Sequence, residues 1–126
     1  MIELKKEKAY KLREIITIVS IAIQKNGVDK LLPDEEMDFC IFTKGYVDVL
    51  SEELVCYVDD YPDINEFDEE IYSNYVKNNN LHNVYSGEQF EDVIGNVLSQ
   101  KGAESTLDDF VIALNHYREK DDFLDF

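Results

Sequence analysis

The chain has 126 residues, of which 44% are hydrophobic and 32% are charged, and its formal net charge is −16. This length fits one acidic domain spanning 1–126, and the eight Tyr and seven Phe residues argue against intrinsic disorder. The negative charge argues against nucleic acids and anionic membranes as partners, because both are polyanions.

The first predicted element is a helix over 2–25. Its apolar residues, from Leu12 to Ile23, recur at three- and four-residue spacing, as on one helical face. Ile18 and Ile21 widen this stripe, so we expect neighbouring elements to cover much of the helix. The β-branched centre would also suit a strand, but the flanking residues favour a helix. The apolar run is too short to span a bilayer and no cleavage site follows it, so we expect neither a membrane segment nor a signal peptide.

Two nearly continuous apolar runs predict short strands over 39–43 and 54–58. Such runs are typical of central strands that are covered on both faces. Each strand contains one cysteine, Cys40 or Cys56. We expect both thiols to be reduced, buried and structural, in a protein of the cytoplasm.

The second half of the chain predicts three more helices and one more strand. A helix over 65–78 would bury Phe67, Ile71 and Tyr75, and a short strand is expected over 83–85. Ser86 and Gln89 form a candidate capping box before a helix over 87–100, and a last helix is expected over 106–119. The whole order predicts an α/β or α+β single domain, with about three short strands packed by four helices.

A catalytic or metal-binding pattern is not found in the sequence. The two histidines, His82 and His116, have no spacing that pairs them with a cysteine, and no His-x-x-x-His or Cys-x-x-Cys is present. Residues 59–70 resemble a calcium loop, but Ile64 stands where such a loop needs glycine. The glycines form no phosphate-binding loop. We therefore expect no catalytic residue, no metal and no cofactor, and a protein that is not an enzyme.

Residues 34–70 concentrate the negative charge, with fourteen acids and one base, Lys44. Aromatic side chains are common anchors of protein interfaces, and acids complement a cationic partner. We expect Asp59 and Asp60 to lie on an exposed loop after the second strand. The alternative interpretation is that Tyr57 and Phe67 belong to the core and the acids only solvate it. The predicted partner-binding residues are Asp59, Asp60, Tyr61, Asp63, Glu66, Asp68, Glu69 and Glu70.

The C-terminal part of the chain resembles a family of small acidic bacterial proteins. Residues 84–96 and 113–123 carry this resemblance, which extends over roughly 54–126. Such chains are similar to immunity proteins of contact-dependent growth inhibition and polymorphic-toxin systems. The resemblance implies a small cytoplasmic protein that neutralises the toxin domain of its own system, and it assigns no site residues.

Three functions of different classes remain open from the sequence. The leading hypothesis is an immunity (antitoxin) protein that binds a cognate toxin domain, a cationic nuclease, and blocks it sterically and electrostatically. The alternative is an acidic nucleic-acid mimic that inhibits a DNA- or RNA-binding enzyme. A compact acidic patch would favour the first, and a long acidic ridge the second. A pocket of convergent carboxylates would instead indicate a small enzyme or regulator.

Overall fold

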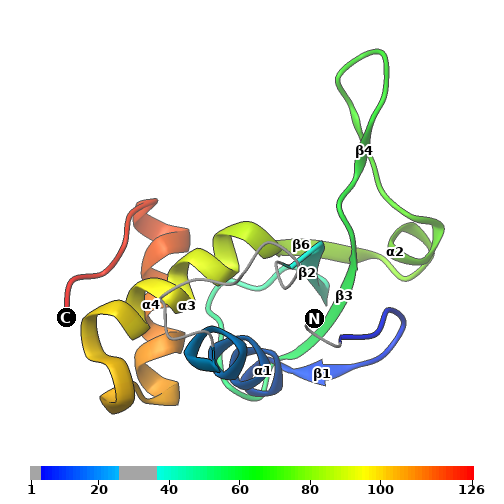
Figure 1. Ribbon diagram of the computed structural model, residues 1–126. Helices are drawn as coiled ribbons and strands as arrows, with labels where there is room; N and C mark the ends of the chain where they lie inside the picture. The colour runs from blue at the N-terminus through cyan, green and yellow to red at the C-terminus, as the bar shows by residue number, and fades with distance from the viewer. Residues whose placement is uncertain (1–3, 26–36) are drawn as a thin grey trace.

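The computed structural model describes residues 4–25 and 37–126, and within them helices and strands are mixed along the chain (Figure 1). The elements in order are β1 (Tyr10–Lys11), α1 (Leu12–Lys25), β2 (Phe39–Lys44), β3 (Val55–Asp60), β4 (Asp63–Ile64), β5 (Glu70–Ile71), α2 (Asn74–Asn78), β6 (Leu81–Ser86), α3 (Gly87–Lys101), the 3-10 turn η2 (Gly102–Glu104) and α4 (Leu107–Lys120). Four α-helices and a small antiparallel sheet within the described residues make one α+β domain, which confirms the predicted fold class.

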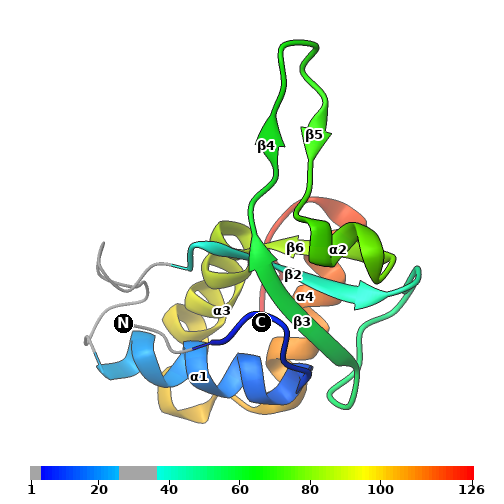
Figure 2. The same cartoon turned by 90° about the vertical axis from the view of Figure 1, so that its right-hand side faces the viewer.

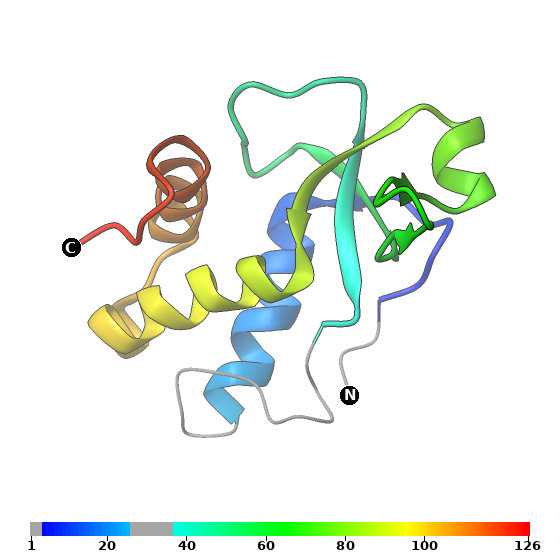
Figure 3. The ribbon, with the colours of Figure 1, turned by 90° about the horizontal axis from the view of Figure 1, so that it is seen from above.

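The main sheet has the strand order β1-β3-β2-β6, and every neighbouring pair is antiparallel. The three long helices, α1, α3 and α4, cover one face of it, and the short α2 lies on the other (Figure 2). Within the helical layer, α3 contacts both α1 and α4 (Figure 3). β2 and β3 are therefore the central strands of the sheet, as the sequence predicted. The face of β3 away from the long helices is only partly covered, since Val55 is 48% exposed.

Alternate residues of β2 enter two separate cores, because successive side chains of a strand point to opposite faces. Ile41 packs into the main core with the long helices. Cys40 and Phe42 face a smaller core that includes Val76 of α2 and Leu81 of β6. Three partly buried tyrosines, Tyr57, Tyr72 and Tyr75, close this smaller core. Helix α2 thus covers the face of β2 that the three long helices do not contact.

The first helix starts later than predicted, at Leu12, and the prediction of a helix from residue 2 is wrong for the described residues 4–11. Tyr10 and Lys11 form β1 instead and pair with Cys56 and Val55 of β3. The amide of Leu12 donates to the carbonyl oxygen of Leu54 at 2.8 Å. The backbone of residues 10–12 is therefore hydrogen-bonded to β3 and the residue before it, and not to a preceding helical turn. The stripe is also narrower than expected, since Ile21 is 58% exposed.

Residues 65–78 do not form the predicted helix. The chain makes a hairpin of β4 and β5 there, and only Asn74–Asn78 is helical, with Ser73 as its N-cap. Phe67 is 73% exposed and Ile71 is 43% exposed, so the apolar stripe predicted for this helix has no core to pack on. Ser73 accepts a hydrogen bond from the amide of Val76. The helical spacing of Phe67, Ile71 and Tyr75 was thus misleading, because only the part next to the sheet is buried.

The last third follows the prediction closely. β6 is longer than expected, whereas α3 and α4 begin and end within one residue of their predicted bounds. Ser86 accepts a hydrogen bond from the amide of Gln89 at 3.1 Å and so caps α3. Phe90 is fully buried in the main core. A Cβ at Gly87 would lie 2.2 Å from the carbonyl oxygen of Phe39, so glycine allows the start of α3 to approach β2.

Candidate functional site

The β4–β5 hairpin, residues 63–71, stands out from the body of the domain (Figure 2). It leaves the sheet at the end of β3 and returns to it through α2. Three of its apolar side chains are well exposed: Ile64 at 60%, Phe67 at 73% and Ile71 at 43%. Exposed apolar side chains gathered on one projection are typical of a binding surface, whereas single ones scattered over a surface are ordinary.

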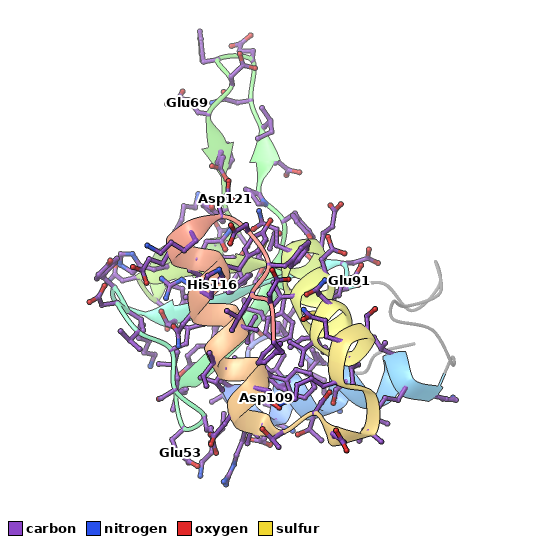
Figure 4. All side chains as sticks on the ribbon, turned by 90° about the vertical axis from the view of Figure 1, so that its left-hand side faces the viewer. Glu53, Glu69, Glu91, Asp109, His116 and Asp121 are labelled. Carbon is purple, nitrogen blue, oxygen red and sulfur yellow. The ribbon has the colours of Figure 1, made fainter. Side chains whose placement is uncertain are left out.

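The charged residues of the hairpin are all acidic. Its five carboxylates are all exposed and its sequence contains no Lys, Arg or His. Among the described residues, none of these five carboxylates makes an ion pair. Figure 4 shows Glu69 on this hairpin, at the opposite end of the molecule from Glu53 and Asp109. The acids are Asp63, Glu66, Asp68, Glu69 and Glu70.

The tip of the hairpin is ordered by Asn65. Its Oδ1 accepts hydrogen bonds from the amides of Phe67 at 2.8 Å and of Glu69 at 3.0 Å. Asp68 adopts a left-handed backbone with φ of +60°, which Asp tolerates better than most residues. A three-residue loop with its last residue in this conformation is a common hairpin connection. The side chain of Phe67 is therefore carried on a defined turn.

The base of the hairpin is held by two tyrosines. The hydroxyl of Tyr61 accepts a hydrogen bond from the amide of Glu88 at 2.9 Å, in the first turn of α3. On the other side, the ring of Tyr72 packs edge-on against Phe42, with centroids 5.8 Å apart, and its hydroxyl donates to Glu70 at 3.0 Å. Partial burial raises the pKa of both hydroxyls above the ordinary value. The hairpin is thus joined to both layers of the domain.

Asp59 and Asp60 do not lie on an exposed loop, and that prediction is wrong. They are the last two residues of β3, and Asp59 is only 3% exposed. An oxygen of the Asp59 carboxylate accepts a hydrogen bond from the amide of Asp60 at 2.8 Å. Asp60 is exposed and forms an ion pair with Lys6 at 2.7 Å. The strand continues two residues further than expected because both pair with β2, Asp59 opposite Cys40 and Asp60 opposite Phe39.

The remaining predicted residues are brought together by the hairpin. Asp63, Glu66, Asp68, Glu69 and Glu70 share it, and Tyr61 lies at its base. The sequence left Phe67 open between an interface anchor and a core residue. It placed Phe67 with Ile71 on the apolar face of a helix and did not include it among the predicted binding residues. The sequence does contain a signal for the hairpin. Asn65 and Asp68 follow Pro62, and these three residue types are common in tight turns. Acidic residues 34–36 lie outside the described residues.

The reactive side chains elsewhere in the described chain do not converge on a site. Both cysteines are free and buried, as predicted, and burial raises the pKa of Cys40 and that of Cys56, the latter to about 12. His82 lies on β6, and His116 on α4 contacts Asp122 at 2.7 Å. Within the described residues, no group of three or more His, Cys, Asp or Glu side chains is placed to hold a metal ion.

A hollow of about 440 Å³ lies between the loop after β2 and helix α4. Arg118, at its edge, donates hydrogen bonds to the carbonyl oxygens of Val47 at 2.9 Å and Asp48 at 3.4 Å. Asn115 bonds both the amide and the carbonyl of Leu50. These contacts hold the loop on the helix, which is a structural role. The lining residues are Tyr46, Asp48, Val49, Asn115, Arg118 and Glu119.

Comparisons with known proteins place the chain in a family. A family model for a domain of unknown function (DUF7716) matches residues 26–126. No curated protein and no solved structure matches the chain. In the part of the chain that the structure describes, no helix is both long enough and apolar enough to cross a membrane.

Proposed function

We propose that this chain, which belongs to the DUF7716 family, is an immunity (antitoxin) protein that binds and neutralises a cognate bacterial toxin domain. The proposed partner is a cationic domain, a nuclease, and the proposed place of action is the cytoplasm of the producing cell. The observation that carries the proposal is the β4–β5 hairpin, where exposed apolar side chains stand among five exposed carboxylates. The resemblance of residues 54–126 to immunity proteins supports the same class of partner.

The proposed mechanism needs binding and no chemistry. A nuclease must hold a polyanion, so its substrate cleft is lined with cations. Carboxylates that carry no neutralising base attract such a cleft over distances of about 10 Å or less at physiological salt. Once bound, the hairpin would occupy the space that the substrate needs. Inhibition would therefore be competitive with the nucleic acid.

The alternative function is a nucleic-acid mimic, which would also use the exposed carboxylates of the hairpin to bind a cationic cleft. A duplex presents a regular ridge of phosphates and exposes no apolar side chain between them. The hairpin instead carries Ile64, Phe67 and Ile71 among its acids, a composition that fits an anchor for one protein pocket better than a substitute for a phosphate backbone. We therefore favour the immunity function.

The test is protection of growth by the chain against its own toxin. The C-terminal domain of the protein encoded immediately upstream is expressed in a sensitive host with and without this chain. The proposal expects growth only when the chain is co-expressed, a complex of the two purified proteins, and nuclease inhibition that added substrate relieves. Full toxicity in the presence of the chain, or no complex, would sink the proposal.

A further inference from the structure

The two faces of the β4–β5 hairpin carry the same mixture of side chains. Residues directly opposite each other in an antiparallel pair point to the same face. Asp63 pairs with Ile71, and Ile64 pairs with Glu70, so each face presents one isoleucine and one carboxylate. All four side chains are exposed. A hairpin that docked flat on a partner would need an apolar face and a solvated face, and this hairpin has neither.

From this register we infer that the β4–β5 hairpin is inserted into a cleft of its protein partner, contacted on both faces, with Phe67 as the deepest anchor. The inference rests on the proposed function, because it takes the toxin domain as that partner. It adds a mode of binding and identifies Ile64, Ile71 and Phe67 as the residues that determine specificity.

Phe67 is suited to the deepest position. It lies at the tip of the projection, 73% exposed, and the bond from its amide to Asn65 fixes the turn that carries it. Binding an aromatic side chain that stands on an ordered turn costs less conformational entropy than binding one on a flexible loop. Aromatic anchors buried at the centre of an interface are the residues that most often dominate binding.

Contacts at the base of the β4–β5 hairpin fix both of its strands to the domain. Tyr61 contacts the first turn of α3 and Tyr72 packs on Phe42 of the central strand β2, so both strands of the hairpin are tied to the domain. An isolated two-stranded hairpin is marginally stable in water. These two attachments, together with the Asn65 turn, keep this hairpin extended away from the domain.

The negative charge of the hairpin indicates which kind of partner contacts its two faces. A second copy of this chain would bring carboxylates against carboxylates, and their repulsion together with the net charge of −16 opposes that pairing. Nucleic acid and anionic lipid are repelled for the same reason. A protein cleft with cationic walls and an apolar floor satisfies the acids on both faces and takes Phe67 at its end.

The experiment compares three variants of the full chain in binding to the upstream-encoded toxin domain, prepared with its nuclease activity inactivated. Ile64→Thr and Ile71→Thr each remove the apolar side chain of one face and keep a β-branched residue in the strand. Phe67→Ala removes the tip. The matched control is Ile112→Thr on α4, where the isoleucine is 54% exposed. Hydrogen exchange of the Asn65 amide, which bonds to the Glu69 carbonyl, reports whether each variant keeps the hairpin.

Insertion predicts that both isoleucine variants raise the Kd by about tenfold and that Phe67→Ala raises it by about 30-fold, with the control within twofold. Weakening by only one of the two isoleucine variants would indicate docking of a single face and would overturn insertion. Wild-type affinity in all three variants would remove the hairpin from the interface and leave the immunity function standing. If the unaltered chain does not bind, the proposed function fails and this inference fails with it.

Discussion

Asn65 and Glu69 close the tip of the β4–β5 hairpin through both their backbones and their side chains. The amide of Asn65 donates to the carbonyl oxygen of Glu69 at 3.0 Å, and the side-chain amide of Asn65 donates to the Glu69 carboxylate at 3.2 Å. Oδ1 of Asn65 accepts from the amide of Glu69 in return. One polar side chain thereby holds the loop that presents Phe67.

We expect Asn65→Ala to loosen the tip without unfolding the domain. The variant loses the bonds to the amides of Phe67 and Glu69, each worth about 1 kcal/mol, but the tip contributes nothing to the main core. Amide hydrogen exchange should speed up at residues 66–70, and the Tm should stay within a few degrees of wild type. Asn79→Ala, which removes a bond to Tyr75 of α2, is the control and should leave exchange at the tip unchanged.

Reversing the charge of the hairpin should slow association with the toxin domain. Asp63→Lys with Glu66→Lys changes two exposed carboxylates of the projection, and steering predicts an on-rate lower by about tenfold at low salt. The salt dependence of the on-rate should also become weaker, because fewer charges act in the approach. Stopped-flow fluorescence at several salt concentrations measures both quantities.

The control for that experiment is Glu104→Lys with Asp125→Lys, which makes the same change of net charge in η2 and near the C-terminus, on the opposite side of the molecule from the hairpin (Figure 1). This pair should leave the on-rate close to wild type. Equal slowing by both pairs would mean that net charge alone steers the encounter and that the hairpin has no special part in it.

Phe90→Ala should destabilise the domain strongly. Phe90, in the first half of α3, is fully buried in the main core, and its ring lies edge-on to Tyr85 of β6 with centroids 5.9 Å apart. The variant loses the favourable burial of the ring and leaves a cavity in the core. We expect its free energy of unfolding to fall by about 3–5 kcal/mol, a large share of the stability of a small domain. Urea denaturation measures the change, with the exposed Phe67→Ala as its control. Unfolding free energies within about 0.5 kcal/mol of each other for the two variants would contradict the burial of Phe90.

Stability should fall at alkaline pH because of Cys56. Burial raises the pKa of this thiol from 9.0 to about 12, so the folded state keeps it protonated while the unfolded chain ionises it. The stabilisation is fully present below pH 9 and is lost between pH 9 and 12, at up to about 1.4 kcal/mol per pH unit. Urea denaturation of wild type and Cys56→Ala from pH 8 to 10 isolates this contribution. A constant difference between the two proteins over that range would refute it.

The placement of elements was most predictable where local pattern and burial agree. In α3 the stripe of Phe90, Ile94 and Val97 faces the core along the whole helix, and Ser86 and Gly102 mark its two ends, so helical spacing and end signals point to the same bounds. The central strands were recognisable for a similar reason. The apolar run of β2 reflects two covered faces, whereas β3 is fully covered only on the side of the long helices and exposes Val55 on the other.

The candidate site was predictable in its composition and not in its shape. The sequence by itself determined that residues 59–70 are acidic, contain aromatic and apolar side chains, and have no base to neutralise them. Only the tertiary structure decided that Asp59 is buried in β3 while Phe67 is exposed on a hairpin. A helix through Phe67, Ile71 and Tyr75 requires a surface to pack on along its whole length. The smaller core beside Phe42 includes Val76 and packs against Tyr75, but neither Phe67 nor Ile71 contributes to it. Periodicity records which side chains can share a face, but the neighbouring layer decides which of those faces is buried.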